Sequence, residues 1–116
     1  MKLLVKKTEV KKFTEHNISV FSEYSLPFNN AAVGISEING RYPEKGYDLD
    51  QKIEQIWYIE KGSGKIWVMD EIYFVGPGDM ILIPKAKKYW IEGKALKLVV
   101  ISSPPWFAEQ HIHLDA

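Results

Sequence analysis

Turn-forming residues divide the segment 55–84, QIWYIEKGSGKIWVMDEIYFVGPGDMILIP, into short apolar stretches at near-regular intervals. We expect a break at Gly62-Ser63-Gly64, a tight reversal at Asp70-Glu71 and a loop at Gly76-Pro77-Gly78-Asp79, because proline and paired glycines interrupt strand ladders. The stretches between these turns are rich in β-branched and aromatic residues, which favour strands. This segment therefore predicts successive strands of a small antiparallel β-barrel.

The rest of the chain continues the pattern, with no long apolar stripe at helical spacing. Within residues 52–60, a period of two places four side chains on one strand face: Ile53, Gln55, Trp57 and Ile59. Further strands are predicted at Leu3 to Lys7, Phe13 to Tyr24, Ala31 to Ile38, Met80 to Ile83, Tyr89 to Glu92 and Leu96 to Ser103. One helical turn is predicted at residues 106–111. The predicted fold class is all-β.

Composition limits the classes of function. The 116 residues, 46% of them hydrophobic, suit a single domain over 1–116, with 1–30 as N-terminal strands and 104–116 as a C-terminal tail. Fifteen basic and fifteen acidic side chains cancel, which disfavours nucleic acid and anionic membranes as partners. The chain has no cysteine, which excludes thiol catalysis and thiolate metal sites. Because the N-terminal residues lack the apolar core of a signal peptide, we expect a cytoplasmic location.

Two segments resemble the sequence motifs of the cupin family. In the second motif, the spacing of Gly78, Pro84 and Tyr89 is similar to the family pattern, with Tyr89 in the place of a histidine. In the first motif, Gln55 stands in the place of the family's glutamate, and Asp48 and Asp50 stand in the places of its paired histidines. The resemblance covers roughly residues 40–103. It implies a double-stranded β-helix, the jelly-roll cupin barrel, with an internal ligand cavity and commonly a homodimeric assembly.

The same resemblance implies that five residues line the cavity and bind the ligand: Asp48, Asp50, Gln55, Trp57 and Tyr89. None of them is a histidine or cysteine, so no iron, zinc or nickel site and no cofactor is predicted. Only a hard divalent cation, Mg²⁺, Ca²⁺ or Mn²⁺, suits oxygen ligands of this kind.

The catalytic candidates are Tyr89, Asp48 and Asp50. The two aspartates are about 7 Å apart on one strand face, so they could form a carboxylate pair that acts as general acid or base. Alternatively, residues 46–51 form a solvated loop, because aspartate is favoured in turns. The Tyr89 phenol could donate a proton to a ligand, or it could only hydrogen-bond within the core.

Five residues outside these motifs are further candidates. His111 and His113 would place two imidazoles on one face of an extended tail, but their nearness to the end of the sequence favours a surface tail. Arg41, the single arginine, could clamp an anion or form a surface ion pair. Trp67 and Trp106 are candidates for the subunit interface of a homodimer.

The sequence therefore predicts a cupin barrel that binds a small polar organic ligand, sugar- or carboxylate-like, without a classical transition-metal site. One alternative is a metal-independent isomerase or epimerase that uses Tyr89 or the Asp48/Asp50 pair for proton transfer. The other is a non-catalytic structural or regulatory module with a closed interior. The sequence leaves these alternatives open.

Overall fold

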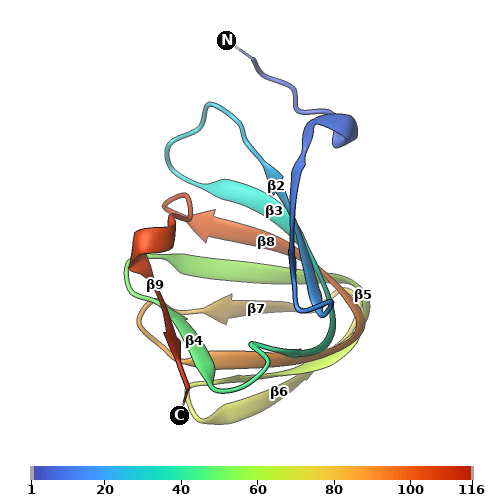
Figure 1. Cartoon of the computed structure of the whole chain (residues 1–116), viewed down its shortest axis with the longest axis vertical. Helices are drawn as coiled ribbons and strands as arrows, with labels where there is room; N and C mark the ends of the chain where they lie inside the picture. The colour runs from blue at the N-terminus through green and yellow to red at the C-terminus, as the bar shows by residue number, and fades with distance from the viewer. Residues whose placement is uncertain (1, 116) are drawn as a thin grey trace.

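The barrel seen in the computed structural model, which describes residues 2–115, is built almost entirely from antiparallel strands (Figure 1). The strands are β1 (Lys11–Glu15), β2 (Ser19–Tyr24), β3 (Ala32–Tyr42), β4 (Tyr47–Asp50), β5 (Glu54–Val68), β6 (Glu71–Val75), β7 (Met80–Ile83), β8 (Tyr89–Ser103) and β9 (His111–Leu114). Two single 3₁₀ turns, η1 (Lys7–Glu9) and η2 (Ala108–Gln110), accompany them. No helix within residues 2–115 is long and apolar enough to cross a membrane. The predicted all-β jelly-roll architecture is confirmed.

The two longest strands, β5 and β8, run antiparallel along most of their lengths and bend together around the barrel (Figure 1). The first half of β5 pairs with β7 and its second half with β6. From β8 the sheet continues through β3 and β2 to β1 in one direction, and through β4 to β9 in the other. The barrel therefore has a β1–β2 hairpin at one end of this path and the β4–β9 pair at the other.

Glycine bends β5 where the sequence predicted a break. The strand continues through Gly62 and Ser63, and its register with β8 shifts on either side of Lys61, as in a β-bulge. Gly62 has φ +77°, and a Cβ atom there would lie 2.0 Å from the carbonyl oxygen of Ala95. The expected break at Gly62-Ser63-Gly64 is therefore wrong, because a residue without a side chain lets the two backbones approach and keeps the strand continuous. The predicted strands 89–92 and 96–103 are likewise one strand, β8.

The N-terminal strands also differ from the prediction. Residues 3–7 form no strand, and the 3₁₀ turn η1 begins at Lys7. The expected strand 13–24 is a hairpin, because His16 and Asn17 both adopt positive φ and reverse the chain between β1 and β2. The tight reversal at Asp70-Glu71 is confirmed, with Met69 and Asp70 at positive φ between β5 and β6.

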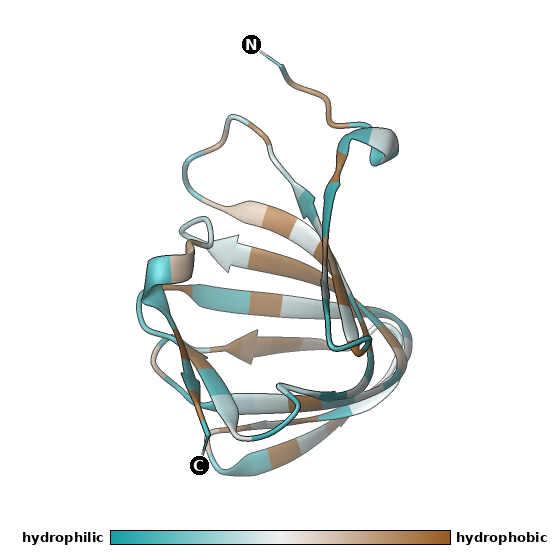
Figure 2. Cartoon of the chain, viewed as in Figure 1, coloured by the Kyte–Doolittle hydropathy of each residue, from teal (hydrophilic) through white to brown (hydrophobic). Residues whose placement is uncertain are grey.

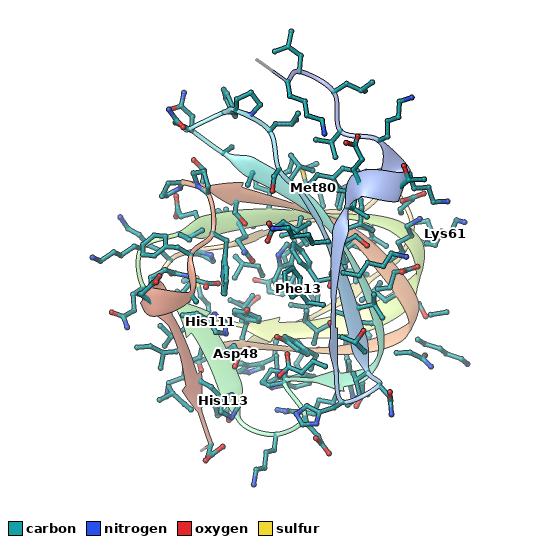
Figure 3. All side chains as sticks on the ribbon, turned by 45° about the horizontal axis from the view of Figure 1, so that its top comes forward. Phe13, Asp48, Lys61, Met80, His111 and His113 are labelled. Carbon is teal, nitrogen blue, oxygen red and sulfur yellow. The ribbon has the colours of Figure 1, made fainter. Side chains whose placement is uncertain are left out.

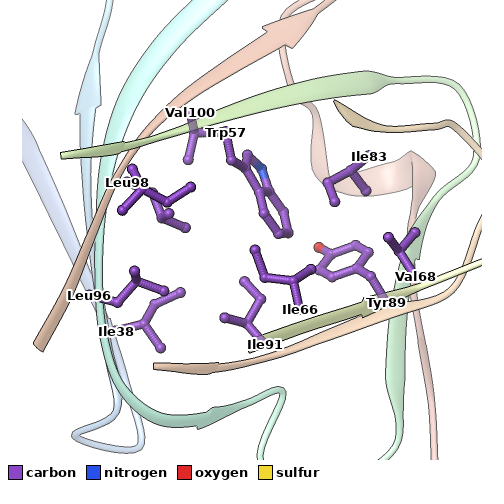
Figure 4. Packing of buried hydrophobic residues seen from close by; sticks show 11 residues of the cluster. Ile38, Trp57, Ile66, Val68, Ile83, Tyr89, Ile91, Leu96, Leu98 and Val100 are labelled. Carbon is purple, nitrogen blue, oxygen red and sulfur yellow. The ribbon is translucent and has the colours of Figure 1, made fainter. Parts of the chain in front are cut away.

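The core follows the alternation of β5 and β8. Gln55, Trp57 and Ile59 are buried, whereas the residues between them are exposed, as predicted from the period of two. All but one of the buried apolar side chains, Ile53 being the exception, form one cluster that fills the bend of the barrel (Figure 4). Its members are Ile38, Trp57, Ile59, Ile66, Val68, Ile83, Tyr89, Ile91, Leu96, Leu98 and Val100. This packing closes one part of the barrel and leaves the part beneath the β1–β2 hairpin for a cavity.

Candidate functional site

A cavity of about 470 Å³ lies between the β1–β2 hairpin and the inner face of β3, β8 and β5. Aliphatic side chains from β3 and β8 form one wall: Ile38, Ile91, Leu98 and Val100. Polar and aromatic side chains form the rest: Phe13, Thr14, Glu15, Ser19, Phe21, Glu23, Ser36, Tyr42, Gln55, Trp57, Tyr89, Ser102, Trp106 and His111. The volume falls in the range of small-molecule sites in proteins.

Three of the five predicted site residues, Gln55, Trp57 and Tyr89, line this cavity. The Gln55 amide is held at both ends, because its Oε1 accepts a hydrogen bond from Trp57 Nε1 (2.9 Å) and its Nε2 donates one to Ser102 Oγ (3.0 Å). The Trp57 and Tyr89 rings meet edge to face with centroids 5.2 Å apart (Figure 4). These contacts fix the orientation of the polar groups that a ligand would meet.

The Tyr89 phenol lies in a buried environment near two aspartates. Burial, together with the negative charges of Asp50 and Asp48, raises its pKa well above the ordinary value of a phenol. The side chain therefore stays protonated at physiological pH and cannot act as a base in the resting protein.

The other two predicted residues, Asp48 and Asp50, are buried side by side on β4, each only 3% exposed. The alternative of a solvated loop at residues 46–51 is therefore wrong. Their neighbours come from β9, which pairs with β4 so that Asp48 lies opposite His113 and Asp50 opposite His111. Figure 3 labels Asp48, His111 and His113 on these two strands. Because side chains alternate along both strands, the two aspartates and the two histidines share one face.

His111 bridges the two aspartates. Its Nδ1 lies 2.9 Å from Asp50 Oδ1 and its Nε2 lies 3.1 Å from Asp48 Oδ2. A neutral imidazole has one N–H and one lone pair, so both contacts are hydrogen bonds only when the ring is doubly protonated. Burial of the ring opposes protonation, but the hydrogen bonds to Asp48 and Asp50 and their charges outweigh it and raise the pKa of His111 to about 9. An imidazolium therefore compensates two buried carboxylates at neutral pH.

The C-terminal segment completes the shell around Asp50. Its Oδ1 accepts further hydrogen bonds from Trp106 Nε1 (3.1 Å) and Gln110 Nε2 (2.7 Å). Its Oδ2 is buried without a hydrogen-bond partner among residues 2–115. The predicted surface tail is therefore wrong: residues 106–114 form part of the site. The helical turn expected at 106–111 is the shorter η2.

His113 has a more exposed position on the same strand. Its Nδ1 donates to Asp48 Oδ1 (2.8 Å) and its Nε2 to Asp115 Oδ1 (2.9 Å), and these hydrogen bonds raise its pKa. The sequence contained the signal for this cluster, because Asp-x-Asp and His-x-His both place two side chains on one strand face. The sequence did not indicate that β4 pairs with β9.

A second cleft, of about 640 Å³, shares His111 with the cavity. All three histidines of the chain line it, together with Glu15, Tyr42, Glu44 and Asp48. Within residues 2–115, no three histidine, aspartate or glutamate side chains are arranged to hold a metal ion. The predicted positions do not fit the metal of a classical cupin, since both aspartates are hydrogen-bonded to histidines and the Gln55 amide is bound to Trp57 and Ser102.

Arg41 and the tryptophans have structural contacts that the sequence did not indicate. Arg41 donates through Nη1 to the Pro43 carbonyl (2.8 Å) and through Nη2 to the Gly46 carbonyl (2.9 Å), and it lies over the Trp90 ring. Arg41 thus holds the loop before β4, and it forms no ion pair with another side chain of residues 2–115. Trp106 contacts the site, and Trp67 packs on Tyr47 with ring centroids 5.0 Å apart.

Comparison with known proteins gives one family match and several structures. The sequence model of the family described as AraC-like ligand binding domain matches residues 36–88 of this chain. A search of curated proteins found no match.

The similar solved structures include Pac13, described as a unique nucleoside dehydratase, with a TM-score of 0.88 and 16% identity over 99% of this chain and 92% of that chain. Variants of Streptomyces Pac13 were solved with uridine. A predicted oxalate decarboxylase from Thermotoga maritima has a TM-score of 0.72 and 14% identity over 88% of this chain and 99% of the other. The cupin domain of Schizosaccharomyces pombe Cnp3 has a TM-score of 0.69 and 13% identity over 85% of this chain and 72% of the other. At these identities the likeness shows a common fold.

Proposed function

Since this chain has the cupin fold that its sequence motifs predicted, we propose that it binds a small polar organic molecule in the cavity beneath the β1–β2 hairpin. The observation that carries the proposal is a 470 Å³ cavity whose polar side chains are held in place by hydrogen bonds. Preorganised polar groups bind a ligand without losing further side-chain freedom. The cavity, and the burial of Asp48 and Asp50, favour this function over a structural or regulatory module with a closed interior.

The charges on the cavity wall favour a neutral, hydroxyl-rich ligand over a carboxylate. Glu15 and Glu23 face the cavity, and no lysine or arginine among residues 2–115 lines it. The one cationic wall residue, His111, is already neutralised by Asp48 and Asp50. An anionic ligand would therefore meet two carboxylates without an uncompensated cation.

Aromatic side chains narrow the ligand class further. Phe13, Phe21, Trp57 and Trp106 line the cavity and can pack on the faces of a ring. A neutral sugar or nucleoside combines a ring with several hydroxyl groups. The likeness to Pac13, described as a nucleoside dehydratase, supports the choice of uridine as a first probe.

Isothermal titration calorimetry with two matched pairs tests the proposal: glucose against glucuronate, and uridine against uridine monophosphate. We expect the neutral member of at least one pair to bind, and to bind at least tenfold more tightly than its anionic partner. The variant Phe13→Ala should weaken binding, whereas Phe74→Ala, on exposed β6 and outside the cavity, should leave it unchanged. Tighter binding of the anionic members would contradict the proposed charge preference, and binding by none of the four would reject the ligand class.

A second candidate function is a metal-independent isomerase or epimerase. The observation that favours it is the His111 imidazolium on the wall of the same cavity that the protonated phenol of Tyr89 lines. In this candidate, the Glu15 carboxylate on the cavity wall accepts the proton of the ligand C–H, and Tyr89 donates a proton or hydrogen bond to the neighbouring ligand oxygen. Asp48 and Asp50 hold the proton of His111 in place. The test is exchange of ligand C–H hydrogens with deuterium oxide in the presence of a chelator, followed by NMR. Exchange that is lost in both Tyr89→Phe and His111→Gln supports an enzyme, and a bound probe without exchange rejects it.

The cellular setting follows from composition. We propose a cytoplasmic protein with no nucleic-acid or membrane partner, since its net charge is zero and it has no cysteine.

A further inference from the structure

The cavity beneath the β1–β2 hairpin and the second cleft adjoin each other. Three residues line both spaces: Glu15 from β1, Tyr42 from β3 and His111 from β9. We call these three residues the collar. Because each collar side chain faces both spaces, the cavity and the cleft meet at this point.

The two spaces differ in polarity. Aliphatic and aromatic side chains such as Leu98, Phe21 and Trp57 wall the cavity. Beyond the collar, the cleft is lined by Pro43 and by polar or charged side chains: His16, Glu44, Lys45, Asp48 and His113. Hydropathy colouring shows the β1–β2 turn and the connection between β3 and β4 largely in teal (Figure 2). A ring with an apolar face therefore suits the cavity, and a group that carries hydroxyls on all sides suits the cleft.

The charges of the cleft favour a neutral group there. Asp48 accepts hydrogen bonds from His113 Nδ1 (2.8 Å) through one oxygen and from His111 Nε2 (3.1 Å) through the other. The remaining side chains that can carry charge are of both signs: Glu15, His16, Glu44 and Lys45. The cleft thus offers hydrogen-bond donors and acceptors without an excess of cations that would attract an anion.

The collar suits an oxygen-rich linkage between two rings. Burial, together with the negative charges of Glu15 and Asp48, raises the pKa of Tyr42 above the ordinary value of a phenol, so its hydroxyl stays a donor at neutral pH. The Glu15 carboxylate on the same collar is an acceptor. A glycosidic oxygen only accepts hydrogen bonds, whereas the hydroxyls beside it also donate, so the two collar groups match the two kinds of ligand oxygen.

We propose that the cleft is a second sugar subsite, and that the ligand is a neutral glycoside of two rings. One ring lies in the cavity, the linkage passes the collar, and the second, hydroxyl-bearing ring lies in the cleft. This inference rests on the proposed function, because the first ring must bind in the cavity. The cleft volume of about 640 Å³ falls in the range of small-molecule sites. Once the first ring is bound, the linkage holds the second ring near its subsite, which increases the overall affinity.

Isothermal titration calorimetry with glucose, cellobiose and maltose tests the proposal on the full chain. We expect at least one disaccharide to bind about tenfold more tightly than glucose or better. The double variant Glu44→Ala/Lys45→Ala, in the exposed loop that lines only the cleft, should weaken disaccharide binding about fivefold and leave glucose binding unchanged. Glu71→Ala/Lys87→Ala is the matched control, since both residues are exposed and line neither space, and it should change neither affinity.

NMR locates the second ring independently. His16 and His113 line only the cleft, and Trp57 lines only the cavity. Glucose should shift the Trp57 indole signal alone, whereas a bound disaccharide should also shift the imidazole C–H signals of His16 and His113. Disaccharides that bind no more tightly than glucose, or that leave both imidazole signals in place, overturn the second subsite. Binding of glucose or uridine in that case leaves the proposed function standing, and binding by none of these probes rejects both.

Discussion

His111 lies directly opposite Asp50 across the β4–β9 pair, with its Nδ1 2.9 Å from Asp50 Oδ1. The same ring reaches diagonally to Asp48 with its other nitrogen. One cationic side chain thus joins the C-terminal strand to two buried carboxylates. The ring also lines the cavity, so the fold and the candidate site share this residue.

Stability should depend on the protonation of His111. Its pKa is about 9 in the folded chain against an ordinary value of 6.5, so protonation stabilises the fold fully below pH 6.5. This contribution is lost as pH rises from 6.5 through 9. We expect the free energy of unfolding in urea to fall across this range by at most about 3 kcal/mol. His111→Gln should abolish most of the fall, and a wild-type stability that rises from pH 6.5 to 9 would contradict the assignment.

Removing the His111 imidazolium should lower the free energy of unfolding by more than the loss of its hydrogen bonds alone. His111→Gln leaves Asp50 buried without a counter-charge and Asp48 with only the more exposed His113, and we expect a loss of about 3–5 kcal/mol at pH 7. Adding Asp50→Asn removes one of the two charges and should restore part of the loss. A double-mutant cycle by urea unfolding should give a coupling energy of about 1–3 kcal/mol. Strict additivity of the two changes would show that the residues do not interact.

The bend of β5 should require Gly62. Gly62→Ala adds a Cβ where the Ala95 carbonyl oxygen lies at 2.0 Å, and the backbone has positive φ. We expect a loss of more than about 2 kcal/mol in thermal or urea unfolding. Gly76→Ala is the matched control, since a Cβ there meets nothing within 4 Å, and its effect should be within about 0.5 kcal/mol. Equal effects of the two variants would count against the close approach at Gly62.

Truncation of a side chain should lower the free energy of unfolding most at the fully buried positions of the core. Ile66 is fully buried, and Ile66→Ala should destabilise the fold by about 2–5 kcal/mol. Ile72, on the adjacent β6, is 48% exposed, and Ile72→Ala should cost less than about 1 kcal/mol. Urea unfolding at pH 7 provides the comparison. Similar costs at both positions would contradict the packing.

The sequence predicted the barrel because the signals for it are local. Alternation in β5 and the turn at Asp70 depend only on neighbouring residues, and both agree with the structure. The break predicted at Gly62 was the exception, because Gly62 instead bends a continuous strand. Glycine is required there because the Ala95 carbonyl of β8 approaches the backbone closely. Local sequence does not reveal contacts with distant strands.

The candidate site was predictable in part for the same reason. Gln55, Trp57 and Tyr89 follow from strand alternation and the family motifs, and they line the cavity. The roles of His111 and Trp106 depend on the return of the last strand to β4, about 60 residues away along the chain. Neither the spacing of His111 and His113 nor that of Asp48 and Asp50 identifies its partner strand.

The central claim, that the barrel binds a small neutral ligand in its cavity, is tested most directly by the indole N–H signals of the four tryptophans in a ¹⁵N NMR titration with uridine and glucose. Trp57 and Trp106 line the cavity, whereas Trp67 and Trp90 lie outside it and serve as internal controls. We predict that a bound probe shifts the Trp57 and Trp106 signals and leaves the Trp67 and Trp90 signals in place. A titration that shifts none of the four, or only Trp67 and Trp90, would contradict the claim.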